Sequence, residues 1–172
     1  MVARVVEAVA AVAHVERQRE TGAEAATDRL VAALECHSKG DAAFRAGDFE
    51  AALLGYRKAH EASGTSALLV SQAACLNGLG RGREALALLD KALAAEAESA
   101  QFWHQRAIGE EQVGRWTSAQ ESCLRALACC KRQMAKGQAD GVLWRVKADC
   151  LRKLDHPWLA MWAYARAWMS AR

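Results

Sequence analysis

The chain has 172 residues, with 23 lysines and arginines against 20 aspartates and glutamates, a net charge of +3, and a hydrophobic fraction of 52%. This length fits one domain or one repeat array, and it is enough for a buried core. A single proline and the lack of β-branched runs argue against an all-β fold, in which turns need frequent breakers. Because alanine is abundant and favours helices, we expect an all-α protein.

The chain begins with an amphipathic segment, which we expect to form a separate helix near Val2 to Arg19 and to cap the rest of the fold. Its most apolar part, Val5 to Val15, contains Glu7 and is much shorter than the roughly 20 residues of a membrane span. The segment also lacks the small-residue cleavage site of a secretion signal. We expect the next helix to start around Ala23.

From residue 33 onward one pattern recurs at intervals of 33, 34 and 41 residues. Residues at equivalent positions of successive repeats form columns. One column holds a turn residue, columns of small residues lie before and after the turn, and one further column after the turn holds mostly larger residues. The turn column is Gly47, Gly80, Gly114 and Asp155; the small columns are Gly40, Ala73, Ala107 and Ala148, then Ala52, Ala85, Ala119 and Ala160, then Ala59, Ala92, Ala126 and Ala167; the remaining column is Tyr56, Leu89, Cys123 and Tyr164. The longer last interval predicts an extended second helix or a longer loop around residues 131–140.

Such columns are typical of antiparallel helix pairs. Small residues let two helices approach closely, glycine ends a helix, and pairs stack because one pair cannot bury its own apolar face. The pattern resembles the tetratricopeptide repeat (TPR) family. The resemblance implies an all-α, right-handed superhelix of about four helix pairs. We therefore divide the chain into an N-terminal helix and lead-in at 1–32 and repeats at 33–64, 66–97, 100–140 and 141–172.

Proteins similar to this one hold peptides or partner domains and have no chemistry of their own. The resemblance therefore implies a non-enzymatic scaffold or adaptor within a multiprotein complex. In the family's pattern, side chains from the first helix of each repeat line a concave groove. Here they are His37, Asp41, Phe44, Arg45, Val70, Asn77, Gln101, His104, Ile108, Arg145, Asp149 and Arg152. This groove ends basic, which suits a partner segment with an apolar middle and an acidic end.

One branch of the family grips the C-terminal carboxylate of heat-shock chaperones with lysine, arginine and asparagine side chains of the first helices. The equivalent positions of this chain hold His37, Asp41, Ser71, Gln101 and Gln105. They supply no fixed cation, and Asp41 would repel a carboxylate. A co-chaperone role with a different grip stays open as an alternative.

The C-terminal end is basic and aromatic. Net charge runs from −2 over residues 1–65 to +4 over residues 141–172, and all six tryptophans lie beyond residue 100. The last helix carries more large apolar residues than one buried face can hold, whereas helical arrays normally end on a polar surface. These residues are Trp158, Met161, Trp162, Trp168 and Met169. We expect this helix to dock another subunit or a second copy of the chain.

The same basic end allows a second reading, in which the protein is part of a ribonucleoprotein assembly. In that case basic side chains of the C-terminal half would lie along RNA phosphates. They are Lys131, Arg132, Lys136, Arg145, Lys147, Arg152 and Lys153.

Cysteines and histidines show no spacing that carries chemistry. There is no CxxC, no His-x-x-x-His and no glycine-rich phosphate loop, so we expect no catalytic residue, no metal and no cofactor. The six cysteines fall in helical patterns and fit buried thiols in a reducing compartment. We therefore expect a cytoplasmic protein, with a mitochondrial or other organellar location left open.

Overall fold

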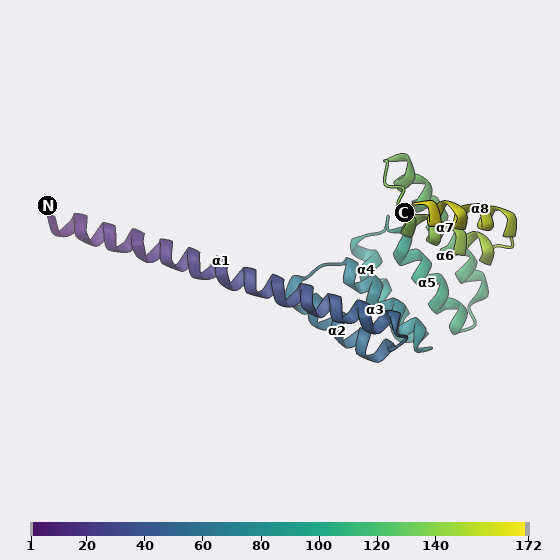
Figure 1. Cartoon of the computed structure of the whole chain (residues 1–172), viewed down its shortest axis with the longest axis horizontal. Coiled ribbons are helices and arrows are strands. Elements are labelled where there is room, and N and C mark those ends of the chain that lie inside the picture. The colour runs from purple at the N-terminus through teal and green to yellow at the C-terminus, as the bar shows by residue number, and fades with distance from the viewer. Residues whose placement is uncertain (1, 171–172) are drawn as a thin grey trace.

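The computed structural model describes residues 2–170, with side chains from residue 23 onward except that of residue 95. This part of the chain contains eight helices and no strand, which confirms the expected all-α fold (Figure 1). The helices are α1 (Val2–Arg45), α2 (Phe49–Ser63), α3 (Ala67–Gly78), α4 (Gly82–Ala95), α5 (Ala100–Gln112), α6 (Trp116–Ala135), α7 (Gly141–Lys153) and α8 (Pro157–Met169).

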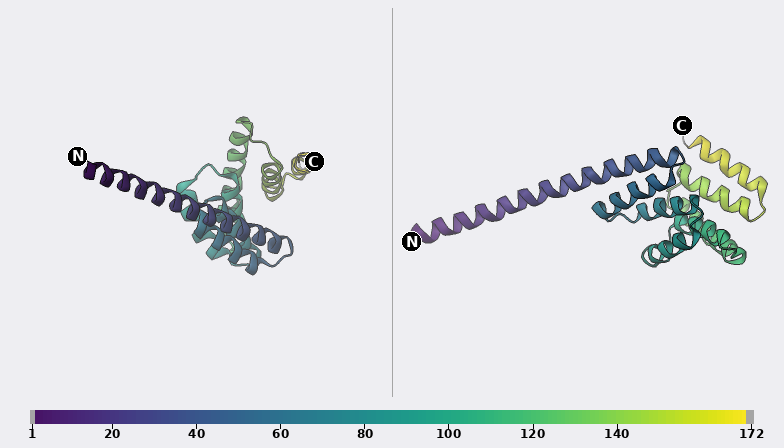
Figure 2. Two further views of the ribbon diagram at one scale, coloured as in Figure 1. Left: turned by 60° about the vertical axis from the view of Figure 1, so that its left-hand side comes forward. Right: turned by 90° about the horizontal axis from the view of Figure 1, so that it is seen from below.

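The first helix differs from the expectation of two separate helices. α1 is continuous over 44 residues, about 66 Å, and its N-terminal part projects from the bundle of the other helices (Figures 1 and 2). Between Arg19 and Ala23 the weakest helix former is Gly22, which costs a helix about 1 kcal/mol relative to alanine and does not end it. The side chains of residues 2–22, and with them the expected capping role, lie outside the described part.

The turns inside the helix pairs follow the predicted column. Gly47, Gly80 and Gly114 have φ angles of 79°, 73° and 78°, and Asp155 has 60°. Glycine adopts this left-handed conformation without strain, and aspartate is among the residues that tolerate it best. After the fourth turn Pro157 begins α8, where its missing N–H leaves no helical bond unmade.

Paired helices pack through the small columns. The alanines of these columns in α2, α4 and α6 are buried, as are Gly40, Ala73, Ala107 and Ala148 on the first helices. A Cβ atom on Gly40 would lie 2.9 Å from Cε1 of Tyr56, and one on Gly55 would lie 3.0 Å from the Cys36 carbonyl oxygen. The two helices of the first pair therefore touch almost backbone to backbone.

The pairs then stack in a row. Each helix contacts the next one in the chain, and α5 also contacts both α3 and α7. The described hydrophobic core is accordingly a series of four clusters along the stack. α6 is 20 residues long, which accounts for part of the extra length predicted before the last pair. Because α3, α5 and α7 are neighbours, their side chains share one surface.

Replacing Gly55 with alanine tests the close approach of α1 and α2. The new Cβ would meet backbone atoms of Cys36 and Gly40, which cannot swing aside as a side chain does. We expect a loss of about 1–3 kcal/mol in the free energy of unfolding, despite the better helix propensity of alanine. Urea unfolding followed by circular dichroism measures it.

The matched control is Leu54→Ala, one residue earlier on α2, where the side chain is exposed. This change should stay within about 0.5 kcal/mol. A Gly55→Ala chain as stable as the original would contradict the packing described.

Candidate partner-binding groove

A hollow of about 200 Å³ opens on the surface shared by α3, α5 and α7. Five of the residues predicted for the groove surround it: Val70, Gln101, His104, Arg145 and Asp149. The rest of its lining is Gln105, Val142 and Val146. The hollow is therefore mixed in chemistry, with apolar walls, two amides and one exposed guanidinium.

His104 is the buried polar group of this hollow. It is 8% exposed, and its Nε2 atom lies 3.6 Å from a carboxylate oxygen of Asp149. Burial lowers the pKa of His104 more than the carboxylate of Asp149 raises it. Lys153, Arg152 and Glu111 also act on the imidazole, and Lys153 forms an ion pair with Glu111. In the folded protein, the neutral imidazole is therefore favoured.

A second hollow of about 230 Å³ lies between α1 and the start of α3. Its lining is largely apolar and includes His37 of the predicted groove. The rest of the lining is Leu30, Ala33, Leu34, Ser63, Thr65, Ala67 and Leu68. Leu30 and Leu34 are both exposed, so this hollow offers an apolar recess to a partner side chain.

Two aspartates predicted to face the groove also form hydrogen bonds between the two helices of a pair. The Tyr56 hydroxyl donates to Asp41 Oδ1 at 2.7 Å, and the Tyr164 hydroxyl donates to Asp149. Burial, followed by the hydrogen bond to Asp41, raises the pKa of Tyr56 above its usual range. Asp41 also lies 3.7 Å from His37 Nε2. Both carboxylates are thus engaged within the fold, in the first and the last helix pair.

Asn77 does not lie on an open surface, contrary to the prediction. It is 6% exposed, and its Nδ2 atom donates to the backbone oxygen and to Oε1 of Gln105, at 2.9 and 3.0 Å. Its own backbone oxygen accepts from Gln112 at 2.6 Å. The side chain is covered because α3 and α5 approach closely beside Gly109, whose Cβ would lie 3.3 Å from Asn77 Oδ1. Asn77 therefore joins two first helices.

The other predicted groove residues lie outside the two hollows. Phe44 packs edge-on against Phe49 with ring centroids 5.3 Å apart, and Arg45 donates from Nε to the backbone oxygen of Asp41. Ile108 is half-buried and Arg152 is exposed.

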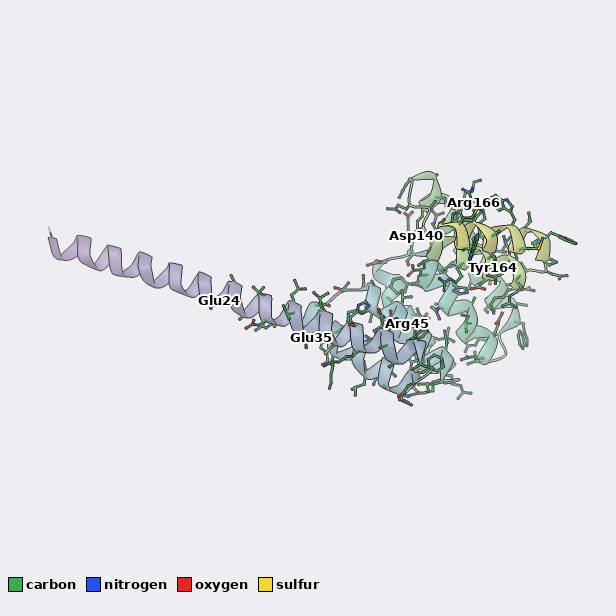
Figure 3. All side chains as sticks on the ribbon, in the orientation of Figure 1. Glu24, Glu35, Arg45, Asp140, Tyr164 and Arg166 are labelled. Carbon is green, nitrogen blue, oxygen red and sulfur yellow. The ribbon has the colours of Figure 1, made fainter. Side chains whose placement is uncertain are left out.

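The last helix exposes the five residues predicted for a second interface. α8 buries only Ala160 and Ala163, while Trp158, Met161, Trp162, Trp168 and Met169 are each more than half exposed. Trp162 packs edge-on against Trp144 of α7, with centroids 5.3 Å apart. The cationic groups of Lys147 and Arg166 lie over the rings of Trp144 and Trp162. Arg166 is labelled in Figure 3.

The cysteines are free thiols, five of them buried. Burial raises the pKa of Cys75 to about 11 and that of Cys130 to about 12, so neither is a reactive thiolate near neutral pH.

Within residues 23–170, apart from residue 95, no three histidine, cysteine or acidic side chains gather as metal ligands would. No helix in the described part is both long enough and apolar enough to cross a membrane.

The architecture was compared with known proteins. No protein-family model matches the sequence, and neither does any curated protein. Solved structures do match. The TPR domain of Arabidopsis OM64 superposes with a TM-score of 0.55 at 18% identity, over 81% of this chain and 96% of that one. The first TPR domain of human RPAP3 gives a TM-score of 0.56 at 16% identity, over 81% and 97%.

The chain has the fold of a tetratricopeptide repeat domain. The TPR2AB domain of yeast Sti1, solved as a complex with pHSP90, also matches, with a TM-score of 0.53 at 15% identity over 80% of this chain and 77% of that one. At these identities the likeness concerns the fold.

Within this TPR fold, sequence reasoning missed three groups at the groove. Leu30 falls in the lead-in, although its spacing to Leu34 and His37 continues one helical face and could have included it. The hydroxyls of Tyr56 and Tyr164 had no sequence signal as partners of aspartate, because they lie on second helices.

The protonation of His104 is directly testable by an NMR pH titration of its imidazole. We expect a midpoint below the ordinary value of about 6.5, because burial favours the neutral form. The unfolded chain then binds more protons than the folded one between the lowered pKa and about pH 6.5, so stability falls as the pH drops through that window. Replacing His104 with glutamine should make the loss of stability with falling pH smaller in that window.

A midpoint above about 6.5 would contradict this assignment. It would mean that attraction to Asp149 outweighs the burial of the imidazole.

Proposed function

We propose that this protein is a non-enzymatic protein–protein interaction scaffold, which holds a partner segment in the concave groove and docks another subunit through α8. The observation that carries the proposal is the hollow across α3, α5 and α7. Among the described residues, the side chains of Gln101 and Arg145 have no hydrogen bond or ion pair, although both line this hollow. Such groups are available to a partner.

The two hollows suggest what the partner segment carries. The hollow beside Leu34 suits a large apolar side chain, since its lining is mostly aliphatic. The hollow beside Arg145 suits an acidic or amide side chain, together with backbone groups that pair with Gln101 and Gln105. The partner is therefore a peptide segment or helix with an apolar residue followed by an acidic end.

Hydrolysis through the His104–Asp149 pair has little support. The hollow's lining contains no serine, threonine, cysteine or lysine that the imidazole could activate. The pair is also tied to Tyr164 through Asp149. We assign these groups to shaping the groove, with no catalytic residue, metal or cofactor.

The ribonucleoprotein alternative is less well supported, because three of its seven basic side chains lie beside carboxylates of the same chain. Arg132 and Lys136 each lie 3.6 Å from the carboxylate of Glu98, and Lys153 pairs with Glu111. The co-chaperone alternative needs a way of binding the chaperone without cations at the clamp positions, where the carboxylate of Asp41 accepts a hydrogen bond from Tyr56. Free, buried thiols fit the reducing, cytoplasmic compartment in which we place the protein.

Selection from a peptide-display library against the immobilised chain tests the groove. We expect the selected peptides to combine a leucine-sized residue with an acidic one. Arg145→Glu should weaken their binding at least about tenfold, because it replaces attraction by repulsion at the polar hollow. Fluorescence anisotropy of labelled peptides measures the affinity.

Lys58→Glu is the matched control, a charge reversal at an exposed site on α2 that lines neither hollow. Its affinity should equal that of the original chain. Peptides that bind the Arg145→Glu chain with unchanged affinity would refute the groove as their site.

A further inference from the structure

α8 carries more exposed large apolar side chains than any other helix whose side chains are described. Trp158 is 78% exposed, and five further large apolar side chains on this helix are exposed by half or more. The side chains that α8 buries are those of Ala160 and Ala163. A face of this kind on a short helix is typical of an interaction site.

The position of Met161 is covered in the first two pairs. By the repeat intervals, Met161 corresponds to Leu53 and Leu86, which are both buried, and to Gln120, which is exposed. Leu53 belongs to a cluster with Leu68 and Leu76 of α3, the first helix of the following pair. At Met161, α8 therefore exposes a position against which the first helix of the following pair packs in the first pair.

The arrangement of small and large side chains on this face also suits a partner helix. Ala165 is a small exposed residue, and large side chains stand three and four positions from it on both sides. They are Met161, Trp162, Trp168 and Met169. Residues at these spacings are neighbours on a helix surface, so Ala165 is a small side chain surrounded by large ones.

Charge distinguishes the possible occupants. α8 contains no acidic residue, and the cationic groups of Arg166 and Lys147 lie 5.8 and 5.9 Å from the centroid of the Trp162 ring. A second copy that packed α8 against α8 would bring the same cations to the interface without a negative charge from either helix. An acidic partner would satisfy them.

We propose that the outer face of α8 binds an amphipathic α-helix of a partner protein, with leucine-sized side chains on one face and acidic side chains along the flank that meets Arg166 and Lys147. This inference deepens the proposed scaffold function, on which it rests, by naming the chemistry of the subunit that α8 docks.

A designed peptide tests the proposal with the full chain. The probe is an 18-residue labelled helix with leucines at i, i+4, i+7 and i+11 and glutamates on one flank, and its match carries lysines in place of those glutamates. By anisotropy, we expect the acidic probe to bind at least about tenfold more tightly than the basic one. Met161→Glu should weaken the acidic probe at least about tenfold, because a carboxylate would then sit in the apolar face.

Two further variants separate the face from general effects. Leu124→Glu places the same charge at an exposed leucine of α6 and should leave the affinity unchanged. Arg166→Glu keeps the apolar residues and should reverse the preference between the two probes. Circular dichroism confirms that each variant is folded.

Equal affinity for both probes, or binding that survives Met161→Glu, would overturn the proposal. So would light scattering that shows a dimer which Met161→Glu dissociates, because the occupant would then be a second copy. Arg145→Glu should not affect the acidic probe. Failure at α8 alone leaves the groove proposal standing, and failure of the groove peptides alone leaves this one standing.

Discussion

The helices of each pair meet through glycine and alanine, and the rest of the molecule depends on this close approach. In the first pair, Gly40 faces the ring of Tyr56 and Gly55 faces the α1 backbone. Because small residues bring the paired helices close together, large apolar side chains such as Leu53 pack against the following pair. No pair is then complete by itself, and stacking follows from the need to bury those side chains.

Stacking produces two surfaces of different chemistry. The first helices lie beside one another, so the side chains that they do not use against second helices gather on one surface, with hollows beside Leu34 and Arg145. At the end of the described stack, α8 exposes large apolar side chains. The groove is mixed in polarity and partly fastened by Asp41 and Asp149, whereas the α8 face is apolar with a cationic side. These differences suit two different partners.

Much of this was readable from the sequence, because its signals are local. A left-handed turn needs glycine or a tolerant residue, so Gly47 and Asp155 could be assigned to turns from the repeat alone. The resemblance to the family's repeat likewise implied that Val70, His104 and Arg145 share one surface, and all three line the hollow across α3, α5 and α7. The prediction failed where the packing of neighbouring helices determines burial and hydrogen bonding. Asn77 has the spacing of a groove residue but is covered by α5. No local signal paired the tyrosines with aspartates on other helices.

The sequence by itself determined the helix pairs, the positions of their turns, the small residues between them and the apolar excess of the last helix, since each depends on residue type and spacing within one pair. Only the tertiary structure decided that α1 is one helix of 44 residues, that Asn77 is buried, and that two hollows open along the first helices. The physical reason is that burial and open space depend on which helices lie side by side. Helical periodicity fixes the face on which a side chain lies, but it does not fix what covers that face.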